Sequence, residues 1–130
     1  MANTKRLLAV DDDASSAELI VRVAERCGYE AFATSDSRGV VNLAKALNPG
    51  IMAVDINMPN VDAIGLFALL AEARFAGKIL IVSGEDESVL KATQAKAEAM
   101  GLNAPYIQQK PLDFRKLRDM LMATEVRDAA

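Results

Sequence analysis

The sequence predicts an α/β domain built on a five-stranded parallel sheet, because two kinds of segment alternate along it. Short, continuous apolar runs are typical of strands covered on both faces, whereas longer segments repeat their apolar residues every three or four positions, as helices do. Only short connections separate these segments. Right-handed crossovers would then place helices on both faces of the sheet.

Five apolar runs mark the predicted strands. The first stops at three consecutive aspartates, Asp11–Asp13, and the third is apolar up to Asp55, as expected of strands buried on both faces. The second alternates in polarity, and the fifth lies between prolines, which sheets tolerate at their edges. In chain order, the strands are predicted at residues 7–10, 29–34, 51–56, 79–82 and 106–108.

Five helices are predicted between and after these strands. Ser15 and Ser16 offer N-cap hydroxyls to the first helix, and Gly28 supplies its stop. The segment 85–100 has a thin apolar stripe, so we expect a loosely held, exposed helix there. The helices are predicted at residues 14–27, from a cap at 35–37 to a break at 48–50, at 63–75, at 85–100 and from about 113 to 121.

The gradient of hydrophobicity among the strands predicts their order. The first, third and fourth runs are the most apolar and should be central, whereas the second and fifth are more polar and should be edges. This arrangement fits the doubly wound, flavodoxin-like order 2-1-3-4-5. In such sheets, ligands bind outside the carboxyl ends of the strands where the strand order reverses, here between the first and third strands.

The composition excludes several classes of function. With 130 residues, 52% hydrophobic and 25% charged, residues 1–130 should form one domain, with a core at about 5–122 and a frayed tail at 123–130. The net charge of −3 argues against direct binding of nucleic acid or of a membrane surface. No apolar run could span a bilayer. The absence of histidine excludes histidine-based catalysis and zinc sites with histidine ligands within this chain. The single cysteine, Cys27, is expected to be a packed thiol in a cytoplasmic protein.

Polar residues follow the strands at the predicted binding edge. Asp11 and Asp12 follow the first strand, Asp55 ends the third, Ser83 follows the fourth and Lys110 follows the fifth. Three carboxylates brought this close would repel one another and raise their own pKa values unless a cation neutralised them. Mg²⁺ fits best, because it uses one or two carboxylates, a carbonyl and waters, and leaves room for phosphate oxygens.

With such an ion present, Asp55 could attack phosphorus as an ionised nucleophile and form an aspartyl phosphate. Lys110 and the metal would neutralise charge on the transferring group, and Ser83 would donate a hydrogen bond to a phosphate oxygen. Each residue taken singly has a simpler explanation: aspartates after strands often cap helices, as Asp13 is expected to do, and Ser83 with Gly84 forms an ordinary turn. The prediction of phosphoryl transfer therefore depends on all of these residues occurring together, each after its own strand.

This ordered set resembles the receiver domain of response regulators in bacterial two-component signalling, particularly the chemotaxis type. The resemblance covers about Lys5 to Leu121. It rests on the acidic cluster after the first strand, the stretch D-I-N-M-P-N-V-D at 55–62, the hydroxyl residue after the fourth strand and the Lys110–Pro111 pair. In the family, the peptide bond of that last pair is cis.

The resemblance also implies roles for individual residues. Asp55 would be the phosphorylation site, Asp12 a direct metal ligand with Asp11 assisting through water, and Asn57 would offer its backbone carbonyl. The metal site thus comprises Asp11, Asp12, Asp55 and Asn57, and the catalytic set comprises Asp55, Ser83 and Lys110. Asn57 and Glu85 fall at positions that tune the lifetime of the phosphate in the family.

Three features depart from the family pattern. Ala63 stands where members usually carry glycine, which tolerates positive φ better. The switch aromatic normally lies three residues before the lysine, where this chain has Ile107, and Tyr106 is one place away. Because a one-residue step in a strand reverses the face, Tyr106 could replace that aromatic only in a bulged strand. The stretch from Ser83 to Lys110 is also longer than usual.

The resemblance implies signalling rather than turnover of a separate substrate. A sensor histidine kinase or a histidine phosphotransfer protein would donate the phosphoryl group, and the only chemistry would be self-catalysed phosphorylation and dephosphorylation at Asp55. The helix at 85–100 and the fifth strand would then be read by a downstream protein or an output domain.

Two other functions stay open at this point. A small haloacid-dehalogenase-like phosphatase also uses an aspartate nucleophile with Ser, Lys and Mg²⁺, but its nucleophile would lie at Asp11–Asp13, which leaves Asp55 unexplained. A phosphorylation-independent interaction module could keep the fold alone. The presence of all five site residues argues against it.

Overall fold

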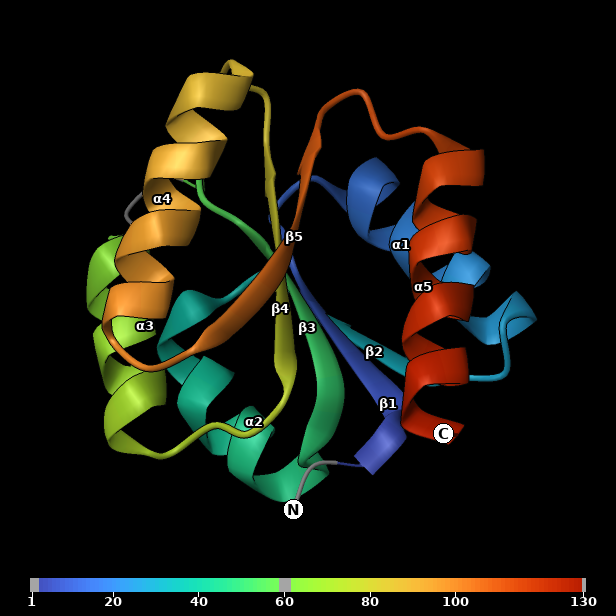
Figure 1. Ribbon diagram of the computed structural model, residues 1–130, viewed down its shortest axis with the longest axis horizontal. Helices are drawn as coiled ribbons and strands as arrows, with labels where there is room; N and C mark the ends of the chain where they lie inside the picture. Colours follow the sequence, from blue (N-terminus) through green and yellow to red (C-terminus); the bar gives the residue numbers. More distant parts are fainter. Residues whose placement is uncertain (1–2, 59–61, 130) are drawn as a thin grey trace.

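A five-stranded parallel sheet forms the centre of the protein (Figure 1). The computed structural model describes residues 3–58 and 62–129. The strands, in chain order, are β1 (Asn3–Val10), β2 (Glu30–Thr34), β3 (Pro49–Asp55), β4 (Lys78–Ser83) and β5 (Asn103–Gln109). They lie in the order β2-β1-β3-β4-β5, and every neighbouring pair is parallel. The predicted topology is therefore confirmed.

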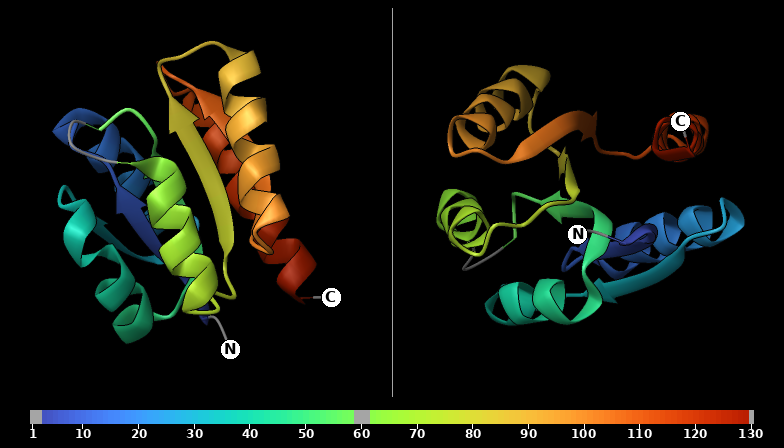
Figure 2. Two further views of the ribbon diagram at one scale, coloured as in Figure 1. Left: turned by 90° about the vertical axis from the view of Figure 1, so that its left-hand side faces the viewer. Right: turned by 60° about the horizontal axis from the view of Figure 1, so that its bottom comes forward.

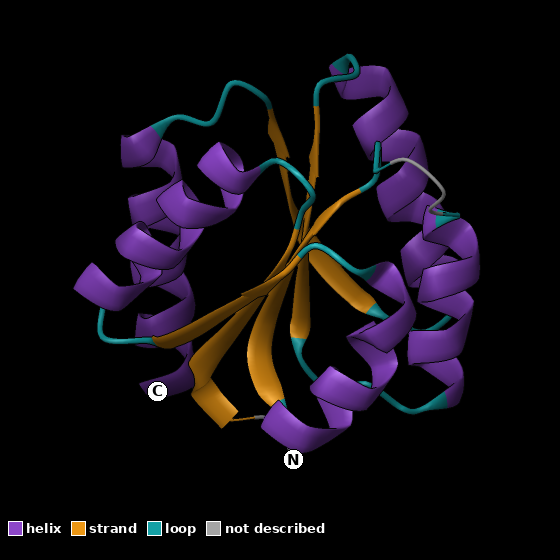
Figure 3. Ribbon diagram, turned by 180° about the vertical axis from the view of Figure 1, so that it is seen from behind, coloured by secondary structure: helices purple, strands orange, loops and turns teal. Residues whose placement is uncertain are grey.

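Helices cover both faces of the sheet, as Figure 3 shows from the opposite side. The helices are α1 (Ala14–Arg26), α2 (Val40–Leu47, preceded by a 3-10 turn at Ser37–Gly39), α3 (Ala63–Glu72), α4 (Glu87–Ala99) and α5 (Phe114–Ala129). α1 and α5 pack on one face, and α2, α3 and α4 pack on the other. Among the described residues, no helix combines the length and the apolar composition that a membrane-spanning segment needs.

The central strands are the most deeply buried, as the hydrophobicity gradient predicts. Every residue of β3 is buried, whereas β2 and β5 keep partly exposed side chains. Side chains of β3 alternate between two cores: Met52 and Val54 pack under α2, α3 and α4, and Ile51 packs under α1 and α5. Each fully buried Val, Leu or Ile contributes roughly 1.5–3 kcal/mol. The strand ends are thereby held in fixed positions.

The N-cap of α1 is Asp13 and not Ser15 or Ser16, whose hydroxyls are the other candidates for that role. Its Oδ1 accepts a hydrogen bond from the Ser15 backbone N–H at 3.1 Å, and its Oδ2 accepts one from Ser16 Oγ at 2.9 Å. A carboxylate has acceptors enough for both donors. The Ser16 hydroxyl, followed by the Ser15 N–H, lowers the pKa of Asp13. Asp13 thus begins the helix, as expected.

The end of α3 differs from the prediction. α3 stops at Glu72 and not at residue 75, and Arg74 adopts a left-handed φ of 58°, which cannot continue a right-handed helix. α5 extends to Ala129, over most of the segment 123–130. That segment contains no glycine or proline to end a helix.

Candidate functional site

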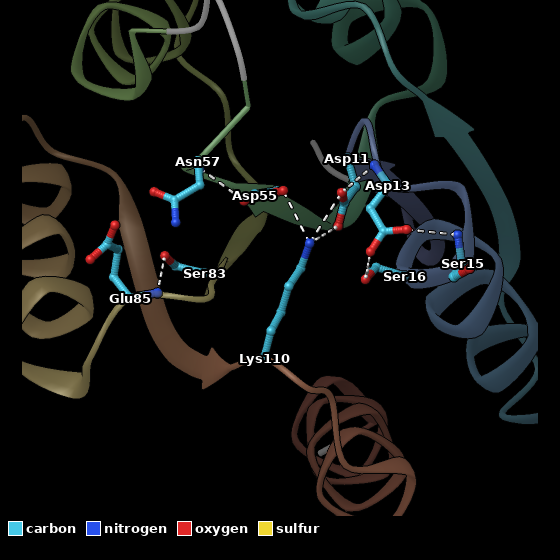
Figure 4. Close-up of polar contacts among 9 residues, drawn as sticks. All are labelled: Asp11, Asp13, Ser15, Ser16, Asp55, Asn57, Ser83, Glu85 and Lys110. Carbon is cyan, nitrogen blue, oxygen red and sulfur yellow. Dashed lines mark hydrogen bonds and ion pairs between the residues drawn. The ribbon is translucent and has the colours of Figure 1, made fainter.

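Four polar side chains meet at the carboxyl edge of the sheet (Figure 4). Asp11 directly follows β1, Asp55 is the last residue of β3, Ser83 is the last residue of β4, and Lys110 directly follows β5. Parallel strands that are in register end at the same edge, so residues far apart in the sequence become neighbours. Asp11, Asp55 and Ser83 are only 3%, 4% and 0% exposed. The structure therefore brings these predicted residues together.

The ammonium of Lys110 lies between two buried carboxylates. Its Nζ is 3.1 Å from Asp55 Oδ2, 3.1 Å from Asp11 Oδ2 and 3.3 Å from Asp11 Oδ1. The Lys110 backbone N–H donates to the Ser83 carbonyl at 2.7 Å, which extends the pairing of β4 with β5 and aims the side chain. The peptide bond from Lys110 to Pro111 is cis, as the resemblance implies.

The same contacts set the pKa of Lys110. Burial by itself would lower that pKa, but the hydrogen bonds to Asp11 and Asp55, with their negative charges, raise it above the usual lysine value. Lys110 therefore stays cationic near neutral pH. It supplies one fixed positive charge at the end of β5.

Asp11, Asp12 and Asp55 form a cluster that could hold a metal ion. One carboxylate oxygen from each lies within 4.8 Å of the others, and Asp12 is exposed while the other two are buried. Their three negative charges face the single charge of Lys110, so the cluster carries excess negative charge. Burial raises the pKa of Asp11, against the lowering effect of the Asp13 N–H and of Lys110, and the charge of Asp55 raises it further.

Asp11 also has an oxygen without a hydrogen bond. Its Oδ1 accepts from the Asp13 backbone N–H at 2.9 Å. Its Oδ2 is buried and forms no hydrogen bond, although it lies 3.1 Å from Lys110 Nζ. A buried carboxylate oxygen normally has a partner. Oxygen atoms of this kind are the ligands that hard divalent cations prefer, so the residues present fit Mg²⁺.

The carboxylate of Asp55 is held at both oxygens. Its Oδ1 accepts from the Asn57 backbone N–H at 2.9 Å, and its Oδ2 faces Lys110. The Ile56 N–H donates to the Val82 carbonyl at 3.0 Å, so pairing with β4 extends one residue past the strand end. Asn57 itself is exposed. Pro59, with residues 60 and 61 of the predicted motif, lies outside the described residues.

Ser83 and Glu85 lie on the side of Asp55 away from Asp11, as Figure 4 shows. Ser83 Oγ accepts a hydrogen bond from the Glu85 backbone N–H at 2.9 Å. Because an accepting hydroxyl keeps its own proton, Ser83 can still donate to a further acceptor. Sequence reasoning did not identify this role of the Glu85 backbone.

The structure also decides which residue of β5 faces α4. One extra residue enters β5 between its pairings with Lys78 and Leu80, and from Tyr106 onward the strand pairs regularly with β4. Ile107 packs in the core under α4, and Tyr106 packs in the core on the opposite face. The irregularity lies before Tyr106, so it does not bring Tyr106 to the position three residues before the lysine. Ile107 occupies that position.

Of the apolar stripe predicted for α4, Leu90 and Ala97 are buried and Val89 is 39% exposed. One hydrogen bond, which sequence reasoning missed, ties α4 to β5: Gln94 Nε2 donates to the Ala104 carbonyl at 2.7 Å. Ala104 lies within the irregular part of β5, where the register with β4 changes. The sequence alone does not identify this role of Gln94, because the partner of its side chain depends on the register between β4 and β5.

Comparison with known proteins agrees with this geometry. The family model described as "Response regulator receiver domain" matches residues 7–122. The chain is 26% identical over 119 residues to the alkaline phosphatase synthesis transcriptional regulatory protein PhoP of Bacillus subtilis, covering 92% of this chain and 48% of PhoP, so it spans about half the length of that relative. It is 31% identical over 97 residues to the chemotaxis protein CheY of Thermotoga maritima, covering 72% and 81% of the two chains.

A solved structure shows the same fold. The crystal structure of a response regulator from Colwellia psychrerythraea superposes with a TM-score of 0.83 at 26% sequence identity, covering 96% of this chain and 99% of that one. The agreement extends over both faces of the sheet, since nearly all of each chain is included.

Proposed function

The chain belongs to the response regulator receiver domain family, and from that premise we propose that it takes a phosphoryl group onto Asp55 and changes its protein contacts in response. The family places it in two-component signalling and makes the phosphatase interpretation unnecessary. One observation carries the proposal: Asp55 is 4% exposed, yet lies 3.1 Å from Lys110 Nζ within a cluster of two further carboxylates. A phosphoryl group at that position would meet an ammonium and a hydroxyl donor.

The proposed cofactor is Mg²⁺, held by Asp11, Asp12, Asp55 and the backbone carbonyl of Asn57. The excess negative charge of the cluster and the unbonded Oδ2 of Asp11 support this assignment. When bound, the ion neutralises charge on the carboxylates and on the transferring group. Lys110 alone cannot do both, because it already faces two carboxylates.

The proposed step is a transfer from phosphohistidine to carboxylate. An oxygen of Asp55 forms an O–P bond while the P–N bond of the donor breaks; the electron pair stays on the imidazole nitrogen, which takes up a proton. The ammonium of Lys110 pairs with the oxygens of the arriving group, and the hydroxyl of Ser83 donates to one of them. The Asn57 N–H holds the carboxylate in place throughout.

The donor is a sensor histidine kinase or a histidine phosphotransfer protein, and the reader is a downstream protein or an output domain. We propose residues 1–130 as one receiver domain in the cytoplasm, where the single buried cysteine, Cys27, suits a reducing compartment. No direct contact with nucleic acid or membrane is part of the proposal, consistent with the net charge of −3. Asn57 and Glu85, beside Asp55 and Ser83, are proposed to tune the lifetime of the phosphate.

The proposal is tested by intact-mass measurement after incubation with phosphoramidate and Mg²⁺. This donor has the same P–N bond as phosphohistidine, so the chemistry is matched without the cognate kinase. We expect one added phosphoryl group on the wild type and none on Asp55→Asn. The matched control is Asp119→Asn, because Asp119 is a 73% exposed aspartate on α5, away from the cluster.

Two results would contradict the proposal. An adduct that persists in Asp55→Asn would move the acceptor to another residue. If phosphoramidate left no adduct and titration calorimetry detected no Mg²⁺ binding, the chain would be assigned to the phosphorylation-independent interaction modules.

A further inference from the structure

A groove lies between α2 and α3, which run side by side on one face of the sheet (Figure 2, left). We define the α2–α3 groove by its apolar residues Val41, Leu70 and Phe75 and its polar residues Lys45, Asn48 and Arg74. Its volume is about 180 Å³. The segment from Val41 to Asn48 and the end of α3 form it, next to the starts of β3 and β4, so it lies at the opposite end of the sheet from Asp55.

The apolar floor of the groove is closely packed at Gly77. A side chain at Gly77 would place Cβ 2.5 Å from the Pro49 carbonyl oxygen and 2.6 Å from Cζ of Phe75. The glycine therefore lets the Phe75 ring pack close to the backbone at the start of β3. Leu70 beside it is fully buried. The floor of the groove is therefore packed directly against the start of β3.

Two cations border the groove without an acidic partner. Lys45 and Arg74 are both exposed, and neither forms an ion pair with a described residue. None of the described residues that line the groove is acidic. The dipole of each helix favours a cation near its carboxyl end. It does not explain why both cations border one apolar hollow in a chain of net charge −3.

Arg74 is also held in an unfavourable backbone conformation. Its φ of 58° is left-handed, in a turn where the Arg74 N–H donates to the Ala71 carbonyl at 3.0 Å and the Phe75 N–H to the Leu70 carbonyl at 2.9 Å. Helices that end in this way usually carry glycine at the left-handed position. An arginine there is strained, and such strain is found most often at functional positions.

The neighbouring surface of α3 is apolar. From Ala63 to Ala71 the helix has no charged or polar side chain, and Leu69 is 53% exposed. Leu69 lies one helical turn before Ala73, which lines the groove. A surface helix normally turns charged residues outward. The apolar surface therefore extends beyond the groove itself.

We propose that the α2–α3 groove binds an acidic, amphipathic peptide segment of a partner protein. One apolar side chain enters the hollow, carboxylates on both sides of it pair with Lys45 and Arg74, and a second apolar residue covers Leu69. The volume suits one side chain, since a cavity of about 150 Å³ accepts benzene. It is smaller than the roughly 300–1,000 Å³ of small-molecule sites. The proposal is independent of phosphorylation at Asp55.

The test is selection from a display library of random short peptides on the full chain, with counter-selection on the Lys45→Glu/Arg74→Glu double variant. We expect the selected peptides to combine acidic residues with an aromatic or aliphatic residue. Their affinity, measured by fluorescence anisotropy, should fall about tenfold or more in the double variant and stay unchanged in Arg115→Glu. Arg115 is the matched control because it is exposed on α5, on the other face of the sheet.

Arg74→Gly separates binding from folding. Glycine suits the left-handed position, so this variant should melt no lower than the wild type and still bind the peptide several-fold more weakly. Amide chemical-shift changes should centre on Val41, Lys45 and Phe75. The proposal is overturned if selection yields no peptide whose binding depends on Lys45 and Arg74, or if the chemical-shift changes lie elsewhere. It is also overturned if benzoate binds in the groove as tightly as the peptides, or if sedimentation shows that a second copy of the chain occupies the groove.

Discussion

The two ends of the sheet place their charges in opposite ways. At the carboxyl edge, Asp11 and Asp55 are buried and meet Lys110 within 3.1 Å. At the amino edge, Lys45 and Arg74 are exposed beside an apolar hollow and have no ion-pair partner among the described residues. Strand ends place the first set, and helix ends place the second. Changes in charge should therefore alter stability strongly at the first end and binding at the second.

The largest effect on stability is expected from Lys110→Met, which leaves Asp11 and Asp55 without their cation. Because removal of one partner leaves buried charge uncompensated, we expect a loss of roughly 2–4 kcal/mol without metal. Mg²⁺ should restore part of that loss. Urea unfolding with and without Mg²⁺ measures both effects.

Lys91→Met is the control for that change. Lys91 also faces a carboxylate, Glu87, at 3.4 Å, but its side chain is 65% exposed. Exposed pairs contribute about 0–1 kcal/mol. Equal losses of unfolding free energy in the two variants would show that burial does not strengthen the ion pairs of Lys110. The proposed difference between the two ends of the sheet would then be wrong.

A steric change is expected to have the next largest effect, at the amino edge. In Gly77→Ala, the added Cβ would lie 2.5 Å from a backbone oxygen, so the strand or the Phe75 ring must shift. Overpacking of this kind costs about 1–3 kcal/mol. Gly39→Ala is the matched control, since a Cβ there meets nothing within 4 Å. Equal unfolding midpoints for the two variants would contradict the close packing inferred for the groove floor.

Arg74→Gly should have a smaller effect of the opposite sign. Relief of the left-handed backbone strain at φ 58° should raise the free energy of unfolding by about 0.5–1 kcal/mol. Arg74→Ala keeps a Cβ and should not be stabilised. Denaturant curves of the three proteins measure the difference, and a wild type more stable than Arg74→Gly would mean that the arginine side chain stabilises the fold.

The smallest effect concerns an exposed carboxylate, Asp86, the N-cap of α4. The carboxylate of Asp86 accepts hydrogen bonds from Ser88 Oγ at 2.6 Å and from the Val89 N–H at 3.2 Å. Both bonds lower the pKa of Asp86 below 3.8, and the bond from Ser88 has the larger effect. Because the folded pKa lies below the unfolded value, this cap stabilises the protein above the unfolded pKa, and its contribution is lost as pH falls through the folded pKa.

Asp86→Asn keeps a capping side chain that does not titrate. The two proteins should have similar unfolding midpoints near neutral pH, and the wild type should lose stability relative to the variant as the pH falls below 3.8. Unfolding curves across this pH range check the sign. Parallel pH profiles of the two proteins would show that the hydrogen bonds of the cap do not lower the pKa of Asp86.

Much of the fold could be predicted, because local patterns carry it. The gradient from the fully apolar β3 to the more polar β2 and β5 predicted the strand order correctly. The errors lie at the ends of elements. β1 begins at Asn3 and β5 at Asn103, earlier than the predicted residues 7 and 106, and the left-handed Arg74 ends α3 early.

The candidate site, like the fold, was predictable in part from the sequence. The sequence by itself determined which residues end the buried strands, since an apolar run that stops at an aspartate is visible without a structure. Only the tertiary structure decided that Lys110 lies between Asp11 and Asp55, that Asp11 Oδ2 has no hydrogen bond, and that Ile107 faces α4 while Tyr106 faces away. These facts depend on register and on contacts between residues as much as 99 positions apart, whereas hydrophobic patterning is a property of neighbours along the chain.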